Sequence, residues 1–342
     1  VLEGIEANPT EGSAQYGVSE NGLLVYLDDV AEIAPFTIVS VDRQGRVTPL
    51  WSERGIYGTP RLSPDGRRLA VSVQRADNWD IWVYDIERDV ATRVTFGERY
   101  DADPVWSPDG RWIAYESEVD GKDGVFRKRA DGTGDAEVLL APGKLTYPAP
   151  HSWSPDGRTL LLQSAGEGGR TDVWSLAADG KSEPEAFLKT PYTESGAHFS
   201  PDGRWVAYES DETGRVEVFV ASYPPGGGKW QISDGGGGQP GWSRDGRELF
   251  FRGAEGVLSV RVSAEGGTFR ASRPEPLFRG PFLGGLRGIT LPGYSFPDYD
   301  VAADGRSFVM FQGATETQRS TRAKVVLGWF EELRRLTAGG PR

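Results

Sequence analysis

The 342-residue sequence contains no cysteine. Disulfide bonds, thiolate zinc sites and cysteine nucleophiles are therefore excluded, and the redox compartment stays open. No run of about 18 apolar residues occurs, so no segment is expected to span a membrane. No signal peptide is recognisable, and the start at Val1 indicates a processed chain or a fragment of a longer protein.

Positive charge is also scarce, because 38 Lys and Arg residues stand against 50 Asp and Glu residues, a net charge of −12. Such a surface repels phosphate backbones and anionic lipids. We therefore expect no nucleic-acid partner and no membrane-surface partner. A protein, a peptide or a small molecule is the ligand class that remains.

Signatures of catalysis are missing as well. The sequence has no G-x-S-x-G motif, no P-loop and no EF-hand loop. It has only two His and three Asn residues. No cofactor is expected. The many Asp and Glu residues could nevertheless form an all-carboxylate calcium site in the channel of the fold predicted below.

Glycine and proline, in contrast, are abundant, with 46 and 23 residues. Many short strands joined by tight turns have this composition. A stretch of residues 105–117, VWSPDGRWIAYES, is nearly repeated at residues 198–210 as HFSPDGRWVAYES. Copies of the SPDG element, some degenerate, occur at Ser19–Gly22, Ser63–Gly66, Ser107–Gly110, Ser154–Gly157, Ser200–Gly203, Ser243–Gly246 and Ala302–Gly305.

The SPDG element has the composition of a turn between two antiparallel strands. Pro presets φ for a type I turn, and Gly supplies the positive φ that closes the hairpin. Four short strands fit into each repeat of about 45 residues, which is the pattern of a propeller blade. The seven copies predict an all-β, seven-bladed propeller of four-stranded antiparallel blades, with six blades as the alternative. A catalytic role for SPDG is disfavoured because it recurs in every blade.

At these residues the chain resembles the TolB-type (WD40-like) β-propeller repeat. The stretches that carry the resemblance are VWSPDGRWIAYES, SWSPDGRTLLLQS, HFSPDGRWVAYES and GWSRDGRELFFRG. GGKWQIS and the ending KVVLGWFEELRRL are similar to bacterial propellers found alone or at the C-terminus of serine/threonine kinase-like proteins. Two departures are evident: TolB has six blades and a separate N-terminal α/β domain, and kinase motifs are absent here.

The resemblance implies a binding or scaffolding role and favours a periplasmic or other extracytoplasmic location, which the residues themselves leave unknown. Propeller lyases that hold a metal with several His residues, and calcium-dependent lactonases that use Asn, are disfavoured by the composition. We expect a non-enzymatic, monomeric propeller that recognises its ligand at the channel mouth. The alternative is a channel-based hydrolase or lyase with a carboxylate-bound cation.

Two candidate binding residues, His151 and His198, lie just before SPDG turns in consecutive blades. They are expected to be neighbours close to the channel. One interpretation is a paired acid and base or the edge of a metal site; the other is two structural His residues bonded to backbone. An extra residue before the Ser154 turn predicts a bulge that re-aims His151.

A ring of tyrosines is predicted at the channel mouth, on the face opposite the SPDG turns. It consists of Tyr57, Tyr100, Tyr147, Tyr192 and Tyr294, each eight to ten residues before a turn Asp. The acids beside them are Glu53, Asp101, Asp103, Glu194 and Asp298. An aromatic, acidic ring could hold a peptide, a sugar or a cationic group. Alternatively, each Tyr caps the core between blades.

The predicted domain organisation is a single β-propeller over residues 1–342. Val1–Ile5 is expected to form the outer strand of the last blade, which would join the termini and remove an open edge. Residues 329–342 are expected to form a short C-terminal helix and tail.

Overall fold

The computed structural model describes residues 7–8, 13–14, 16–19, 23–27, 35–76, 78–97, 100–254, 256–264, 268–280, 282–283, 297–313 and 323–337. The chain divides into a small unit, Val1–Ala34 with Ala314–Arg342, and a large unit, Pro35–Gly313. The expectation that a single propeller domain covers residues 1–342 stays a prediction. Val1–Ile5 lies outside the described residues.

The small unit contains short strands and one helix. Strand β1 (Ala7–Asn8) pairs with β2 (Ser13–Ala14). Strand β4 (Leu24–Leu27) pairs with both β3 (Tyr16–Val18) and β30 (Ala323–Val326). Helix α1 (Trp329–Thr337) lies within the segment predicted to be helical.

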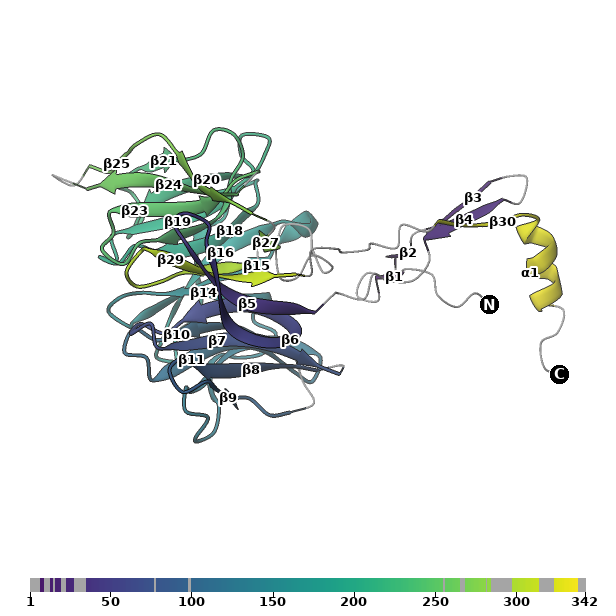
Figure 1. Cartoon of the computed structure of the whole chain (residues 1–342), viewed down its shortest axis with the longest axis horizontal. Coiled ribbons are helices and arrows are strands. Elements are labelled where there is room, and N and C mark those ends of the chain that lie inside the picture. Colours follow the sequence, from purple (N-terminus) through teal and green to yellow (C-terminus); the bar gives the residue numbers. More distant parts are fainter. Residues whose placement is uncertain are drawn as a thin grey trace. The chain divides into compact units, whose positions relative to one another are not determined.

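Antiparallel sheets fill the large unit (Figure 1). One sheet contains β10 (Asp101–Trp106), β11 (Trp112–Val119), β12 (Lys122–Arg129) and β13 (Glu137–Leu140). The next contains β14 (Thr146–Trp153), β15 (Thr159–Ala165), β16 (Thr171–Ala177) and β17 (Glu185–Leu188), with the 3-10 turn Glu167–Gly169 between β15 and β16. A third contains β18 (Glu194–Phe199), β19 (Trp205–Ser210), β20 (Glu217–Ser222) and β21 (Lys229–Gln231). A five-stranded sheet contains β22 (Gly238–Trp242), β23 (Glu248–Arg252), β24 (Gly256–Ser263), β25 (Arg270–Ala271) and β26 (Glu275–Arg279).

The remaining sheet has eight strands because the long strand β6 (Val47–Leu62) belongs to two arrays. The first half of β6 pairs with β5 (Phe36–Asp42), and its second half pairs with β7 (Arg68–Arg75). The other strands of this sheet are β8 (Asn78–Asp85), β9 (Val90–Arg93), β27 (Phe282–Leu283), β28 (Tyr299–Val301) and β29 (Ser307–Gln312). Because β29 pairs with β5, strands from both ends of the large unit share one sheet.

The predicted count of seven blades is not confirmed. Counted as arrays of four main strands, the described part of the large unit holds six. Of the copy at Ser19–Gly22, only Ser19 is among the described residues; it lies between the paired strands β3 and β4, and its amide donates to the Leu23 carbonyl oxygen (2.9 Å). Strand β4 of this β3–β4 hairpin pairs with β30 in the small unit and, among the described residues, not with a strand of the large unit. A turn signature specifies the local hairpin but does not determine which sheet its strands join.

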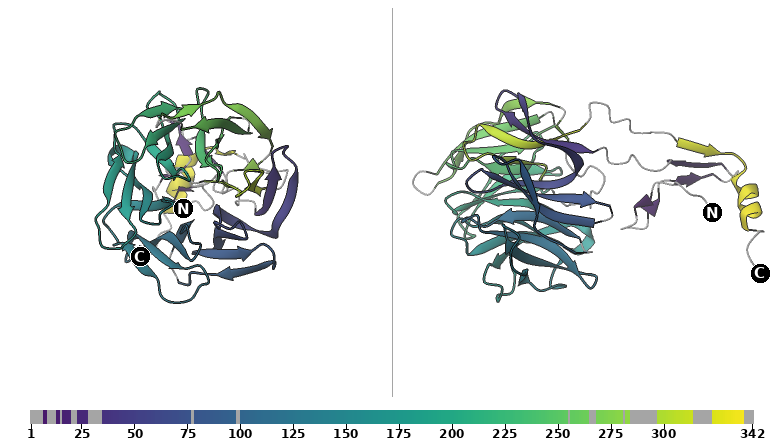
Figure 2. Two further views of the ribbon diagram at one scale, coloured as in Figure 1. Left: turned by 90° about the vertical axis from the view of Figure 1, so that its left-hand side faces the viewer. Right: turned by 60° about the horizontal axis from the view of Figure 1, so that its bottom comes forward.

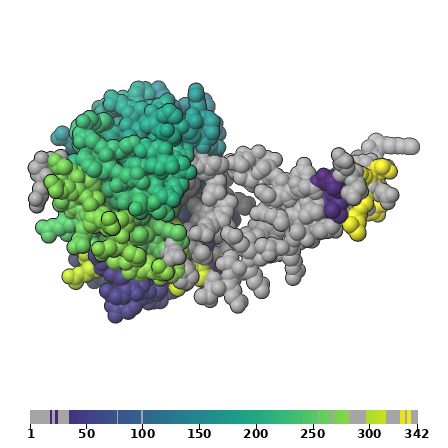
Figure 3. All heavy atoms as spheres, turned by 90° about the horizontal axis from the view of Figure 1, so that it is seen from above, coloured from purple at the N-terminus to yellow at the C-terminus, as the bar shows by residue number. Residues whose placement is uncertain are grey.

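The sheets of the large unit are arranged radially around a common centre (Figure 2, left). Each innermost strand contacts the next in the order β6, β10, β14, β18, β22 and β28, and β28 contacts β6. The colours on the surface change gradually along this order (Figure 3), since sheets that are consecutive in sequence are neighbours in space.

The SPDG elements form the predicted turns, and the structure explains their serine. The Ser107 hydroxyl donates to Asp109 Oδ1 (2.6 Å) and accepts from the Trp112 amide (2.9 Å). Gly110 has φ of 66°, the left-handed conformation expected from the sequence. The same serine–aspartate bond recurs at Ser63, Ser154, Ser200 and Ser243. Serine thus closes the hairpin that Pro and Gly preset.

The hydrophobic core consists of layers between neighbouring sheets. In one such layer, Ala70 and Ile81 of the sheet formed by β6 to β9 pack with Trp106 and Ile113 of the next sheet. This arrangement explains the apolar residues on both faces of the strands. It leaves the ends of the innermost strands to carry polar side chains.

Candidate functional site

The innermost strands bring polar side chains to the centre of the large unit. We call Arg61, Asp103, His151, His198 and Asp300 the central cluster. They come from β6, β10, β14, β18 and β28, respectively. Arg61, His198 and Asp300 each lie four residues before the Asp of a turn. This shared spacing was the signal that could have identified Arg61 and Asp300 from the sequence.

Arg61 is the buried cation of the central cluster, with 6% of its surface exposed. Burial lowers its pKa, while the carboxylates of Asp300 and Asp103 oppose that shift. Its Nη2 lies 3.4 Å from His198 Nε2. A guanidinium can only donate, so Nε2 accepts and the proton of the neutral His198 ring is on Nδ1. Within the described part of the chain, the Arg61 Nε atom has no hydrogen-bond partner.

The two His residues are neighbours, as the sequence predicts. Their rings meet edge to face with centroids 6.2 Å apart. The register of β14 against β15 shifts between Pro150 and Ser152, so His151 occupies a bulge at the expected position. Burial lowers the pKa of His151 to about 3 and that of His198 well below its usual value. Both rings are therefore neutral at pH 7.

Asp103 occupies a second kind of bulge, one that the sequence does not reveal. Its φ is 54°, and Thr59, Gly196 and Gln239, also six residues before a turn Asp, share the left-handed conformation. Asp103 accepts a hydrogen bond from the Thr59 hydroxyl at Oδ1 (2.6 Å), and its amide donates to Ser72 Oγ (3.2 Å). Burial raises the pKa of Asp103 to about 6.

The other predicted acids are used mainly within the sheets. Asp101 is buried, and burial raises the pKa of its carboxyl group. Hydrogen bonds from Ser117 and Thr95 act in the opposite direction but only partly offset this rise. Glu194 is buried and accepts a hydrogen bond from the Thr190 hydroxyl; burial raises its pKa as well. These carboxyls order the chain where it enters β10 and β18.

Three of the predicted tyrosines are accessible at one end of the innermost strands. Tyr147 lies in β14, Tyr100 directly precedes β10 and Tyr192 lies two residues before β18; they are 39%, 37% and 44% exposed, respectively. Burial nevertheless raises the pKa of the Tyr100 hydroxyl well above its usual value, so only part of this side chain faces solvent. We call this end the tyrosine face and the opposite end, with the SPDG turns, the turn face. The edge of the Trp79 ring supports Tyr100, with centroids 6.4 Å apart.

The two remaining tyrosines do not add to this surface in the described residues. Tyr57 is buried, its ring packs against Trp51 and Phe311, and its hydroxyl donates to the Glu53 carbonyl oxygen (2.8 Å). It belongs to the core, which was the alternative interpretation for each tyrosine. Tyr294 lies outside the described residues.

The last two of the predicted acids, Glu53 and Asp298, lie beside arginines. Glu53 is exposed and pairs with Arg75 (2.7 Å), and Asp298 is buried with Arg252 Nη2 3.6 Å from its Oδ2.

A side chain from one turn crosses the turn face. Arg244 occupies the place of Pro in the copy at Ser243–Gly246, and its guanidinium donates to the Pro64 carbonyl oxygen of another turn. The Pro64 turn joins β6 and β7, the Arg244 turn joins β22 and β23, and the innermost strand β28 lies between β6 and β22 in the order of contacts. The loss of Pro at this copy therefore places a cation between two turns.

A small polar cavity of about 130 Å³ adjoins the central cluster. Arg61, His198, Gln239, Tyr299 and Asp300 contribute to its wall. Most polar groups in the wall have partners within the protein. The Tyr299 hydroxyl donates to the Gln239 carbonyl oxygen (2.8 Å), and Asp300 accepts from the Leu62 amide (2.7 Å).

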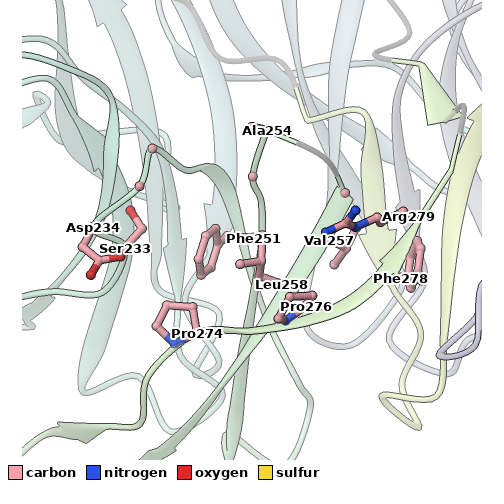
Figure 4. Close-up of a pocket in the computed structure, with 14 residues that line it drawn as sticks. Ser233, Asp234, Phe251, Ala254, Val257, Leu258, Pro274, Pro276, Phe278 and Arg279 are labelled. Atoms are coloured by element: carbon pink, nitrogen blue, oxygen red, sulfur yellow. The ribbon is translucent and has the colours of Figure 1, made fainter.

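An apolar cavity of about 200 Å³ lies elsewhere, beside the outer strands β24 and β26. Phe251, Leu258, Pro274 and Pro276 line it (Figure 4). It has no cluster of titratable side chains comparable with the central cluster, so we assign no site there.

Among the residues that the structure describes, no three His, Asp or Glu side chains gather in a way that could hold a metal ion. In the same part of the chain, no helix is long and apolar enough to cross a membrane.

Comparisons with known proteins agree with the architecture. Residues 26–146 match the TolB beta propeller domain. The uncharacterized protein Atu1656 of Agrobacterium fabrum is 30% identical over 147 residues, which cover 40% of this chain and 46% of the relative. Matches to the first curated relatives span less than half of those proteins.

Two solved structures share the fold. A putative TolB from Agrobacterium tumefaciens has a TM-score of 0.61 at 20% identity, covering 83% of this chain and 99% of its own. Oligogalacturonate lyase from Vibrio parahaemolyticus has a TM-score of 0.51 at 12% identity, covering 91% and 83%. At these identities the likeness concerns the fold alone, and function has to be argued from the site. Over residues 26–146 the chain is similar to the TolB beta propeller domain, and its fold is that of TolB-like propellers.

Proposed function

We propose that this chain is a binding module that takes a protein, peptide or small ligand at the tyrosine face. The observation that carries the proposal is the exposure of Tyr100, Tyr147 and Tyr192 at corresponding places in three consecutive sheets. Tyrosine offers a large rigid contact surface with a polar tip, and it is enriched among residues that dominate binding energy.

The scaffold beneath these tyrosines is well suited to recognition. Asp101 and Glu194, which follow Tyr100 and Tyr192 closely in sequence, are buried and hydrogen-bonded. The connections that carry the tyrosines are therefore held by ordered strands, and variable loops on a rigid scaffold are where recognition concentrates. A binding role needs only these elements, whereas a channel hydrolase or lyase would need a catalytic set that no observation favours.

We also infer that the six arrays close into a six-bladed ring rather than a seven-bladed one. Two observations support this closure: β28 contacts β6, and β29 pairs with β5 along Ser307–Gln312 and Thr37–Asp42. A ring that joins strands from both ends of the large unit removes the open edges of its first and last sheets. A closed ring gives the ligand one defined mouth.

Replacing the exposed tyrosines should weaken ligand binding without unfolding the protein. Tyr100→Ala and Tyr147→Ala are each expected to cost about 1–3 kcal/mol of binding free energy, because the aromatic contact is lost. The ligand can be selected from an array of short peptides and from proteins of the native cell retained on the immobilised chain. Isothermal titration then gives Kd for each variant, with the melting temperature measured alongside.

The matched control is Val138→Ala, which truncates an exposed apolar side chain on the outer strand β13. It should leave Kd unchanged. If the tyrosine variants unfold and binding follows only the folded fraction, these tyrosines are structural and the site lies elsewhere.

A further inference from the structure

The Arg61 guanidinium has more donors than the protein uses. Among the described residues, its one hydrogen-bond partner is His198 Nε2 at 3.4 Å, and Nε has none although Arg61 is more than nine-tenths buried. An arginine carries five N–H donors in a planar fork. Leaving such donors unsatisfied in the interior is costly, so a partner at this place would be bound favourably.

The nearby carboxylates do not fill that role. Asp300 accepts from the amides of Leu62 (2.7 Å) and Val301 (2.9 Å), and Asp103 accepts from the Thr59 hydroxyl (2.6 Å). Both act on Arg61 electrostatically and keep it charged. In the described part of the chain, neither Asp300 nor Asp103 forms a hydrogen bond with the Arg61 guanidinium.

The cavity beside Arg61 limits what can bind. Its volume is about 130 Å³. Since one water occupies about 30 Å³ in the liquid, the space admits a small group such as a carboxylate. Two of the other side-chain donors in its wall are committed, since Trp242 Nε1 donates to the His198 carbonyl oxygen (3.1 Å) and the Tyr299 hydroxyl donates to the Gln239 carbonyl oxygen (2.8 Å).

We propose that Arg61 binds a carboxylate of the ligand in this cavity, with the carboxylate oxygens accepting from the guanidinium fork. Planar pairing between guanidinium and carboxylate is the interaction for which arginine is suited. The inference rests on the proposed function, because the ligand enters from the tyrosine face. Two sources share this chemistry, a small carboxylic acid and the C-terminus of a peptide.

The first test uses the wild-type protein at pH 6 and acetate alone. Acetate should shift one arginine Nε–H resonance in a saturable manner, and Arg61→Lys should remove that resonance. The control Arg204→Lys, which alters an exposed arginine paired with Asp202 on the turn face, should leave the response intact. The absence of a saturable shift, or a shift with inorganic phosphate but not with acetate, overturns the carboxylate assignment.

The second test separates this proposal from the proposed function. The tightest peptide from the array is compared with its C-terminal amide on wild-type protein, so that no variant has to fold. If the terminal carboxylate is the one bound, the free acid should bind at least about tenfold more tightly, as expected for a charge-assisted pair. If the peptide carries side-chain carboxylates, each is replaced by its amide in the same way.

The outcomes are distinguishable. If no amide replacement changes Kd but Tyr100→Ala still weakens binding, the carboxylate site is wrong and the tyrosine face stands. If acetate saturates Arg61 but neither tyrosine variant affects the peptide, the carboxylate site stands as a small-molecule site and the tyrosine face is wrong.

Discussion

Phe308→Ala is expected to lower the free energy of unfolding by about 3–5 kcal/mol, the range for truncating a buried phenylalanine. Phe308 is fully buried on β29, between β28 and β5. Its ring meets Phe250 edge to face with centroids 5.1 Å apart and also contacts Phe278. Truncation removes these contacts where the last strands meet the first, and urea denaturation followed by tryptophan fluorescence measures the loss.

The matched control is Phe96→Ala, which truncates an exposed phenylalanine and should change stability by at most about 0.5 kcal/mol. A cost below about 1 kcal/mol for Phe308→Ala would mean that β29 contributes little to the fold. The inferred closure of the ring through β29 and β5 would then be wrong.

Asp103→Asn is expected to stabilise the protein at neutral pH by up to about 3 kcal/mol, because one pKa unit corresponds to about 1.4 kcal/mol. Burial raises the pKa of Asp103 from 3.8 to about 6. Asparagine tolerates the left-handed conformation at this position, and its Oδ1 can still accept from the Thr59 hydroxyl. The substitution therefore removes the charge and keeps the geometry.

Between about pH 6 and pH 3.8 the stability of the wild-type protein should rise as the pH falls, whereas ordinary acid denaturation lowers stability. A raised carboxyl pKa means that the folded state binds the proton more tightly, so stability rises as pH falls from above 6 towards 3.8. Asp109 behaves oppositely: its hydrogen bond with Ser107 lowers its pKa to about 2, so this stability is lost as pH falls below 3.8. Stability should be greatest at mildly acidic pH.

Thermal or urea unfolding across this range measures both effects. The Asp103→Asn variant should show a smaller gain in stability than the wild type when the pH is lowered from about 7 to about 4, on either side of the raised pKa. An equal gain in both proteins would mean that Asp103 is not the group responsible.

Local features of this chain could be predicted from the sequence, because they depend on neighbouring residues. The turn at Ser107–Gly110 and the bulge at His151 follow from the residues that form them. The proximity of His151 and His198 also follows, since both lie at similar distances from their turns in consecutive repeats.

Features that depend on distant partners could not be predicted. Tyr57 is buried because Phe311, from the far end of the large unit, packs against it. The hairpin at Ser19 looks like a blade element, but its partner is β30. The spacing of Arg61 from its turn Asp is visible in the sequence, but its contact with His198 forms only when β6 and β18 are brought together.

Amide hydrogen exchange with and without the selected peptide tests most directly whether the ligand binds at the tyrosine face. The account predicts protection in the segments around Tyr100, Tyr147 and Tyr192, and no change at the turns Ser107–Gly110, Ser154–Gly157 and Ser200–Gly203 on the turn face. Protection confined to the turn face, with none around the three tyrosines, would contradict it.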